Sequence, residues 1–137
     1  MMISTKGRYA LRVMIDIAQN GSDAPVSLHD VAKRQQISIK YLEAIISMLV
    51  KAGFVDSFRG KTGGYLLKKA PEKITVREII EVTEGTTAPV ACTGENCPRH
   101  SECMTAPLWN ELEKMIGDYL ENITLKNVID GDINRNI

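Results

Sequence analysis

The sequence lacks the long apolar segments of a membrane protein. No apolar run approaches the roughly 20 residues that a helix needs to span a bilayer. The N-terminus carries Lys6, Arg8 and Arg12 and has no apolar signal-peptide segment. We therefore expect a cytoplasmic protein with no membrane partner. With 137 residues, 44% of them hydrophobic and 25% charged, the chain is sized for one globular domain with an appendage.

Cysteine and histidine are both scarce. Three cysteines, Cys92, Cys97 and Cys103, fall within one stretch of twelve residues, and their odd number does not suit the disulfide framework of a secreted protein. Clustered thiols in a cytoplasmic chain indicate metal or redox chemistry instead. A cysteine enzyme using Cys97 with His100 is disfavoured, because the other histidine, His29, lies in a predicted surface helix and no carboxylate stands at a recognisable orienting position. We expect no enzymatic activity.

Neither sign of charge is in excess, yet the charges are unevenly distributed. Residues 1–69 hold eleven Lys and Arg against five Asp and Glu, a net charge of +6. Residues 70–137 hold six against twelve, a net charge of −6. A basic half suits a polyanion such as nucleic acid, whereas the acidic half suits assembly or sensing. Solvation of two surface faces is the alternative explanation.

Apolar periodicity predicts three helices in the basic half. The first begins at Ser4 or Thr5 and ends near Asn20, the second follows Ser27, and the third is capped by Ser38. Each carries one apolar face, formed by Ala10, Val13, Met14, Ile17 and Ala18 in the first helix, Val31 and Ala32 in the second, and Leu42, Ile45, Ile46 and Leu49 in the third.

Two short strands, residues 54–58 and 64–67, follow the three helices and are joined by a glycine-rich cationic loop, residues 59–63. Three helices followed by such a hairpin describe a winged helix-turn-helix, in which the third helix enters the major groove and the wing lies beside phosphates or the minor groove. The predicted fold class is therefore mainly α with a small β-hairpin, and the expected partner is double-stranded DNA.

The polar residues of this scaffold are the candidate DNA contacts. Glu43 is the candidate base reader, because a carboxylate near phosphates is costly unless it accepts a hydrogen bond from a base donor such as cytosine N4. Taken alone, Glu43 also fits a solvated helix position, and Tyr41 equally fits a ring buried in the core. The full predicted set comprises Lys6, Tyr9, Ser38, Lys40, Tyr41, Glu43, Ala44, Arg59, Gly60 and Lys61.

The acidic half is predicted to contain a helix, a loop and a second, longer helix. Thr75 and Glu78 form a capping box before the first helix, which ends near Gly85. Residues 86–106 show no helical or strand period, and Pro107 fits the first position of the long helix. The apolar stripe of this helix predicts that the helix forms a dimer, and packing of the stripe on the chain's own body is the alternative. The stripe consists of Leu108, Leu112, Met115, Ile116, Tyr119 and Ile123.

A short helical turn over residues 124–130 and a loose tail over residues 131–137 are expected to follow. The expected organisation is a DNA-binding domain at residues 1–84, a cysteine-containing sensor loop at 85–106, and a dimerisation helix with its tail at 107–137.

The cysteine loop allows three chemistries. Its cysteines are separated by four and then five residues, and His100 lies between the second and third. Three thiolates with one further ligand suit an iron–sulfur cluster, and three thiolates with His100 suit zinc. A reversible thiol switch would need only two of the cysteines. Inert structural cysteines are disfavoured, because the loop is polar.

Four segments together resemble the IscR-type regulators, a bacterial family that includes NsrR and CymR. They are residues 4–11 (STKGRYAL), 37–43 (ISIKYLE), 59–67 (RGKTGGYLL) and 122–125 (NITL), and the resemblance extends over nearly the whole chain. It implies a homodimeric winged-helix repressor or activator, in which Glu43 and Arg59 fall at base-reading and wing positions. It also implies that Cys92, Cys97 and Cys103 ligate a cluster, usually [2Fe-2S], and that the regulated genes serve cluster assembly.

Two departures from the family's pattern leave the fourth ligand open. The family has one more residue between the first two cysteines, and it places a histidine where this chain has Ala106. His100, Glu95, Glu102 or a group of the partner subunit are the candidates, and [2Fe-2S] is favoured over [4Fe-4S]. Two further hypotheses are the same fold with a zinc or thiol-redox loop, and a winged domain that binds protein instead of DNA.

Overall fold

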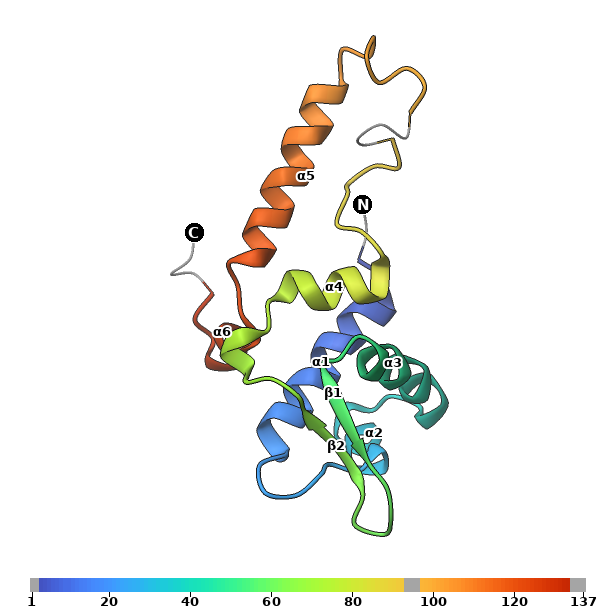
Figure 1. Ribbon diagram of the computed structural model, residues 1–137, viewed down its shortest axis with the longest axis vertical. Helices are drawn as coiled ribbons and strands as arrows, with labels where there is room; N and C mark the ends of the chain where they lie inside the picture. Colours follow the sequence, from blue (N-terminus) through green and yellow to red (C-terminus); the bar gives the residue numbers. More distant parts are fainter. Residues whose placement is uncertain (1–2, 93–96, 134–137) are drawn as a thin grey trace.

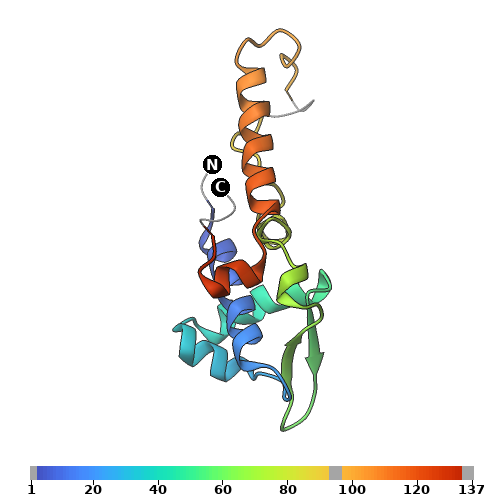
Figure 2. The ribbon, with the colours of Figure 1, turned by 90° about the vertical axis from the view of Figure 1, so that its left-hand side faces the viewer.

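The computed structural model describes residues 3–92 and 97–133. A helical body carries a two-stranded hairpin at one end, and one long helix projects from the other end (Figures 1 and 2). The elements are α1 (Thr5–Asn20), α2 (Leu28–Gln35), α3 (Ile39–Lys51), β1 (Val55–Phe58), β2 (Gly64–Leu67), the 3-10 helix η1 (Pro71–Lys73), α4 (Val76–Glu84), α5 (Ala106–Glu121) and α6 (Leu125–Asp130).

The three predicted N-caps are confirmed. The side chains of Ser4, Ser27 and Ser38 each accept a hydrogen bond from the main-chain N–H three residues ahead, at the starts of α1, α2 and α3. Helix α2 ends at Gln35, and its C-cap Gln36 adopts the left-handed conformation with φ 55° and so turns the chain directly into α3. These local signals produce the tight turn between α2 and α3 of a helix-turn-helix.

The predicted hairpin is also present. Strands β1 and β2 pair antiparallel, with Val55 opposite Leu67 and Phe58 opposite Gly64. An isolated bridge between Val26 and Tyr65 ties the outer edge of β2 to the segment before α2. The wing is therefore anchored on both sides to the helix-turn-helix.

The core lies where α1, α3 and α4 meet. The predicted apolar faces of α1 and α3 are buried, and Met14, Ile17, Leu42 and Leu49 are fully enclosed. Ala18 and Ala32 are partly buried against this core.

The C-terminal segment returns to the body. Helices α4 and α6 begin with matching capping boxes, Thr75 with Glu78 and Thr124 with Asn127, and the two threonines face each other in an antiparallel bridge. The start of the predicted tail is bonded to α6, because the main-chain N–H of Asp132 donates to the Asn127 carbonyl at 2.8 Å. Residues 134–137 lie outside the described residues.

Two details of α5 differ from the sequence prediction. The helix begins at Ala106 after its N-cap Thr105, which places Pro107 at the second helical position instead of the first. Ile123 is only 4% exposed and packs with Val76 and Ile80. It therefore belongs to the body of the molecule and is not part of an uncovered stripe.

Candidate nucleic-acid interface and sensor loop

The outer face of α3 presents the predicted DNA contacts. Lys40, Glu43 and Ala44 are exposed on the side opposite the buried apolar stripe, and Ser38 is exposed at the helix N-terminus. This arrangement follows from the helical period, because residues one and two positions away from a buried residue point elsewhere. The face offers one carboxylate and one ammonium group for base and phosphate contacts.

The starts of α1 and α3 lie side by side. The rings of Tyr9 and Tyr41 meet edge to face, with centroids 5.7 Å apart, and the Arg12 guanidinium lies 5.1 Å from the centre of the Tyr9 ring. A cavity of about 430 Å³ opens between the two helices and is lined by Thr5, Tyr9, Gln36, Ile37, Ser38 and Tyr41. Three predicted contact residues, Tyr9, Ser38 and Tyr41, therefore share one surface hollow. Lys6, one turn earlier on α1, is half-buried.

The wing presents the predicted cationic tip. Arg59, Gly60 and Lys61 are all exposed. Gly60 has φ 106°, which a side chain rarely tolerates, and a Cβ on Gly63 would lie 2.3 Å from the Phe58 carbonyl oxygen. The glycines therefore allow a tight turn that leaves the two cationic side chains free to reach a nucleic acid.

Sequence reasoning missed a polar network that joins α1 to α2. Asp16 is 2% exposed and accepts hydrogen bonds from Arg34, at 2.7 Å from Nη2, and from Gln35, at 2.8 Å. Arg12 in turn donates to the side chain and the main-chain carbonyl of Gln35. The available signal was an acidic residue within the apolar face of α1. The network fixes the last turn of α2, immediately before the turn into α3.

In the described part of residues 85–106 the three cysteines are free thiols. Cys92 is exposed, and Cys97 and Cys103 are half-buried. The thiol of Cys103 lies 3.1 Å from the Thr105 hydroxyl. That hydrogen bond lowers the pKa of Cys103 below its ordinary value, aided by main-chain N–H groups at the start of α5 and by the charge of Arg99. A lowered pKa favours the thiolate, the form that binds metals.

His100 connects the loop to α5. Its main-chain N–H donates to the Cys97 carbonyl, and its Nε2 lies 3.2 Å from the amide nitrogen of Asn110 in the second turn of α5. An amide nitrogen donates, so Nε2 accepts this hydrogen bond, and a metal would have to take the place of Asn110 to use the same lone pair. Glu102 is exposed, and Glu95 lies outside the described residues.

The donor set of the loop fits a soft metal centre in its chemistry. Three thiols with an imidazole between them are suitable ligands for an iron–sulfur cluster or zinc. Within residues 3–92 and 97–133, no three His, Cys, Asp or Glu side chains are already gathered to hold a metal. Ligation would therefore require the loop to rearrange.

Helix α5 exposes an apolar face. Leu108 is 58% exposed, Met115 61% and Tyr119 42%, and Leu112 lies on the same side. Figures 1 and 2 show the helix standing away from the body over most of its length. Its base is fixed through Gly117, which is buried against the Arg77 guanidinium of α4.

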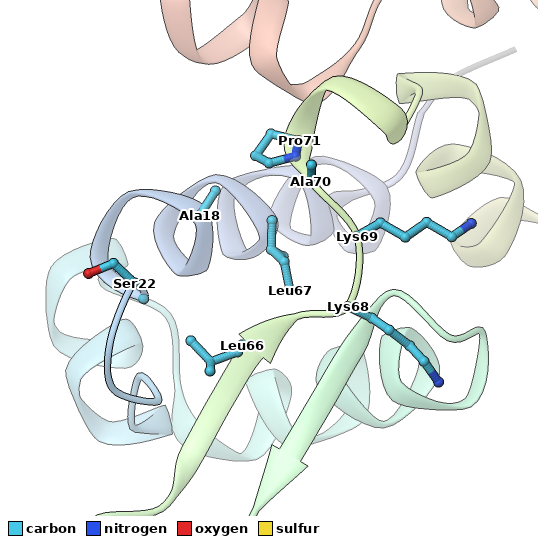
Figure 3. Close-up of a pocket in the computed structure, with 9 residues that line it drawn as sticks. Ala18, Ser22, Leu66, Leu67, Lys68, Lys69, Ala70 and Pro71 are labelled. Atoms are coloured by element: carbon cyan, nitrogen blue, oxygen red, sulfur yellow. The ribbon is translucent and has the colours of Figure 1, made fainter.

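One cavity lies away from all predicted site residues. It has a volume of about 300 Å³ and lies between the end of α1 and the end of β2. Figure 3 shows Lys68 and Lys69 pointing away from the gap between Ser22 and Leu66. We assign this cavity no function.

None of the described helices is long and apolar enough to cross a bilayer.

Comparison with known proteins identifies relatives along nearly the whole chain. Residues 3–131 match the model of the Rrf2 family, described as an iron-dependent transcriptional regulator. The chain is 42% identical over 131 residues to Protein rrf2 of Nitratidesulfovibrio vulgaris, covering 94% of this chain and 87% of that protein. It is also 42% identical over 130 residues to the HTH-type transcriptional regulator IscR of Erwinia tasmaniensis, covering 94% and 79%.

Solved structures agree with this similarity. CymR, the global cysteine regulator of B. subtilis, has a TM-score of 0.79 at 37% identity, with 96% of this chain and 98% of CymR covered. T. potens IscR has a TM-score of 0.76 at 36% identity, with 96% and 88% covered. The predicted mainly helical winged-helix fold and the resemblance to IscR-type regulators are thereby confirmed.

Proposed function

The chain belongs to the Rrf2 family of transcriptional regulators and is not an enzyme, and from this premise we propose that it is a homodimeric repressor controlled by an iron–sulfur cluster. In this proposal residues 1–84 read operator DNA, residues 85–106 sense the cluster, and residues 107–137 form the dimer. The observation that carries it is the position of the thiol loop. It joins the body to the apolar helix α5, and His100 and Cys103 make contacts at the start of that helix.

The surface formed by α3 and the wing, here called the reading head, supports operator binding. Glu43 stands exposed on α3, while Arg59 and Lys61 stand exposed at the wing. We propose that α3 enters the major groove, with Lys40, Ala44, Ser38 and the Tyr9–Tyr41 pair beside it, and that Lys6 supports the backbone contacts.

The Glu43→Ala variant is expected to lose preference at one base pair, because a side-chain contact to a base edge contributes about 1–3 kcal/mol of discrimination. The measurement is selection of duplexes from a randomised library at fixed salt, by wild type and variant in parallel. Lys40→Ala is the matched control, since loss of a phosphate contact weakens all sequences alike. An unchanged preference in Glu43→Ala would remove this residue from base recognition.

We propose that Cys92, Cys97 and Cys103 ligate the cluster, [2Fe-2S] in preference to [4Fe-4S], and that His100 is the first candidate for the fourth ligand. The lowered pKa of Cys103 and the place of His100 between Cys97 and Cys103 support these assignments. When bound, the cluster would supply a centre that can be reversibly oxidised or lost, and its ligation would order the loop beside α5. Zinc is the second candidate, because the same four side chains form an acceptable zinc set.

Cys103→Ser is expected to abolish cluster loading. Anaerobically reconstituted wild type should contain iron and acid-labile sulfide and absorb visible light, and the variant should show background values of all three. Trp109, the one tryptophan, lies in the first turns of α5, and its fluorescence should be quenched in the loaded wild type and not in Cys103→Ser. Ser101→Ala is the control, since it alters the same loop without removing a proposed ligand.

Metal analysis of the same samples separates the alternatives. Zinc without sulfide in the wild type would favour the zinc site over the cluster. A wild type that contains neither iron nor zinc would contradict both proposals. If His100→Ala loads as much cluster as wild type and Glu102→Ala loads less, the fourth ligand is Glu102 and not His100. Transcription from a promoter of cluster-assembly genes, with loaded and unloaded protein, tests repression.

A further inference from the structure

A cavity of about 320 Å³ lies between the second half of α3 and the inner face of the hairpin. Helix α3 and strand β1 pack against each other along this side of the body. The cavity is lined by Glu43, Ile46, Ser47, Val50, Lys51, Ser57 and Tyr65. Of these, only Glu43 is among the predicted DNA contacts.

The polar side chains that line this cavity have no hydrogen-bond or ion-pair partner among the described residues. The hydroxyls of Ser47, Ser57 and Tyr65 make no hydrogen bond to a described residue, and the Lys51 ammonium makes no ion pair to one. Ser47, Lys51 and Ser57 are also exposed. One ammonium group, three hydroxyl groups and, at one end, the Glu43 carboxylate therefore line an open hollow.

The charges are ordered along α3. Glu43, Ser47 and Lys51 are spaced four residues apart and form one row on the helix surface. At 1.5 Å of rise per residue, this row extends over about 12 Å. The carboxylate stands at the end that faces the start of α3, and the ammonium stands at the far end beside the wing.

When a winged helix binds duplex DNA, the space between its third helix and its wing faces one strand of the DNA backbone. If α3 occupies the major groove and the tip of the wing reaches the minor groove, the sugar–phosphate strand that divides the two grooves runs between them. The cavity is the space between α3 and the hairpin. Lysine ammonium groups and Ser and Tyr hydroxyls are among the side-chain groups that bind phosphate oxygens.

We propose that this cavity seats the phosphodiester backbone of one operator strand, with Lys51 pairing a phosphate and Ser57, Ser47 and Tyr65 donating to its oxygens. Glu43, at the opposite end of the row, then lies toward the base edges and away from the phosphate. The inference rests on the proposed operator binding and adds a sequence-independent seat to it.

The experiment compares wild type with Lys51→Ala on the operator duplex and on an unrelated duplex over a range of salt concentrations. Each phosphate contact contributes about 0.9 to the slope of log affinity against log salt. Lys51→Ala is expected to reduce that slope by about 1 and to weaken both duplexes by the same factor. Lys73→Ala is the control, because it removes one exposed charge from η1, away from α3.

A second measurement locates the contact. Operator duplexes carrying one neutral methylphosphonate are tested in turn; one position should weaken wild type and leave Lys51→Ala unaffected, and Ser57→Ala should show a smaller loss at that position. A Lys51→Ala slope equal to that of Lys73→Ala would overturn the inference while operator binding stands. Wild type with no salt-dependent duplex binding would overturn the proposed function itself.

Discussion

The Asp16→Ala variant is expected to unfold with a free energy about 3 kcal/mol lower than wild type, because removing one partner leaves the other partners of a buried ion pair unmatched. Asp16 is 2% exposed and bonded by Arg34 and Gln35. The Arg34 side chain is 39% exposed and can be rehydrated, so the expected loss lies at the lower end of the range for such pairs. Urea denaturation at neutral pH measures it, and Asp23→Ala, an exposed loop change, is the control.

The loss should depend on pH in one direction. Burial opposes ionisation of Asp16, but hydrogen bonds from Arg34 and Gln35 and the charge of Arg34 outweigh it, so the pKa of the carboxyl lies below its ordinary value. A depressed pKa contributes its full stability above the unfolded value of about 3.9 and loses it as pH falls through the folded pKa. The difference between wild type and Asp16→Asn should therefore be constant near pH 7 and shrink below about pH 4. A difference that grows in acid would contradict this account.

The same network affects the reading head. Gln35 is fixed by Asp16 and Arg12, and it directly precedes the left-handed Gln36 and the cap of α3 at Ser38. Asp16→Asn, which preserves shape better than alanine, should therefore also weaken operator binding before the protein unfolds. Thermal and binding measurements on one sample separate the two effects.

Local signals explain how much of this fold could be predicted. The caps Ser4, Ser27 and Ser38 and the capping box at Thr75 act over three residues, and the structure contains all four. The left-handed turn at Gln36 gave no signal, because glutamine rarely adopts that conformation.

Longer-range features were harder to predict. Asp16 occupies a helical position next to Ile17, and only the arrival of Arg34 from α2 makes its burial favourable. Ile123 continues the period of α5, yet the chain bends after Glu121 and directs it into the body. The pairing of residues distant in sequence decides both cases. The cavity between α3 and the hairpin is likewise a product of two elements, so no single segment indicated it.

Charged substitutions on the apolar face of α5 are expected to dissociate the proposed dimer. In Leu112→Glu combined with Met115→Glu, two carboxylates would have to be buried without partners in the contact between the two α5 helices. Sedimentation velocity should show wild type as a dimer and the variant as a monomer. Operator affinity should fall on the order of 100-fold or more, because the second half-site no longer binds at the effective concentration set by the first.

The choice of control and target makes this prediction specific to the interface. Lys114→Glu adds negative charge to the same helix on another side and breaks an exposed pair with Asp118 at 3.5 Å, so it should leave the dimer intact. Binding to a single half-site should be equal in all three proteins, because α3 and the wing are unchanged. If the double variant stays dimeric, the apolar face of α5 has another role. If it is monomeric yet binds the full operator as tightly as wild type, dimerisation does not supply the affinity.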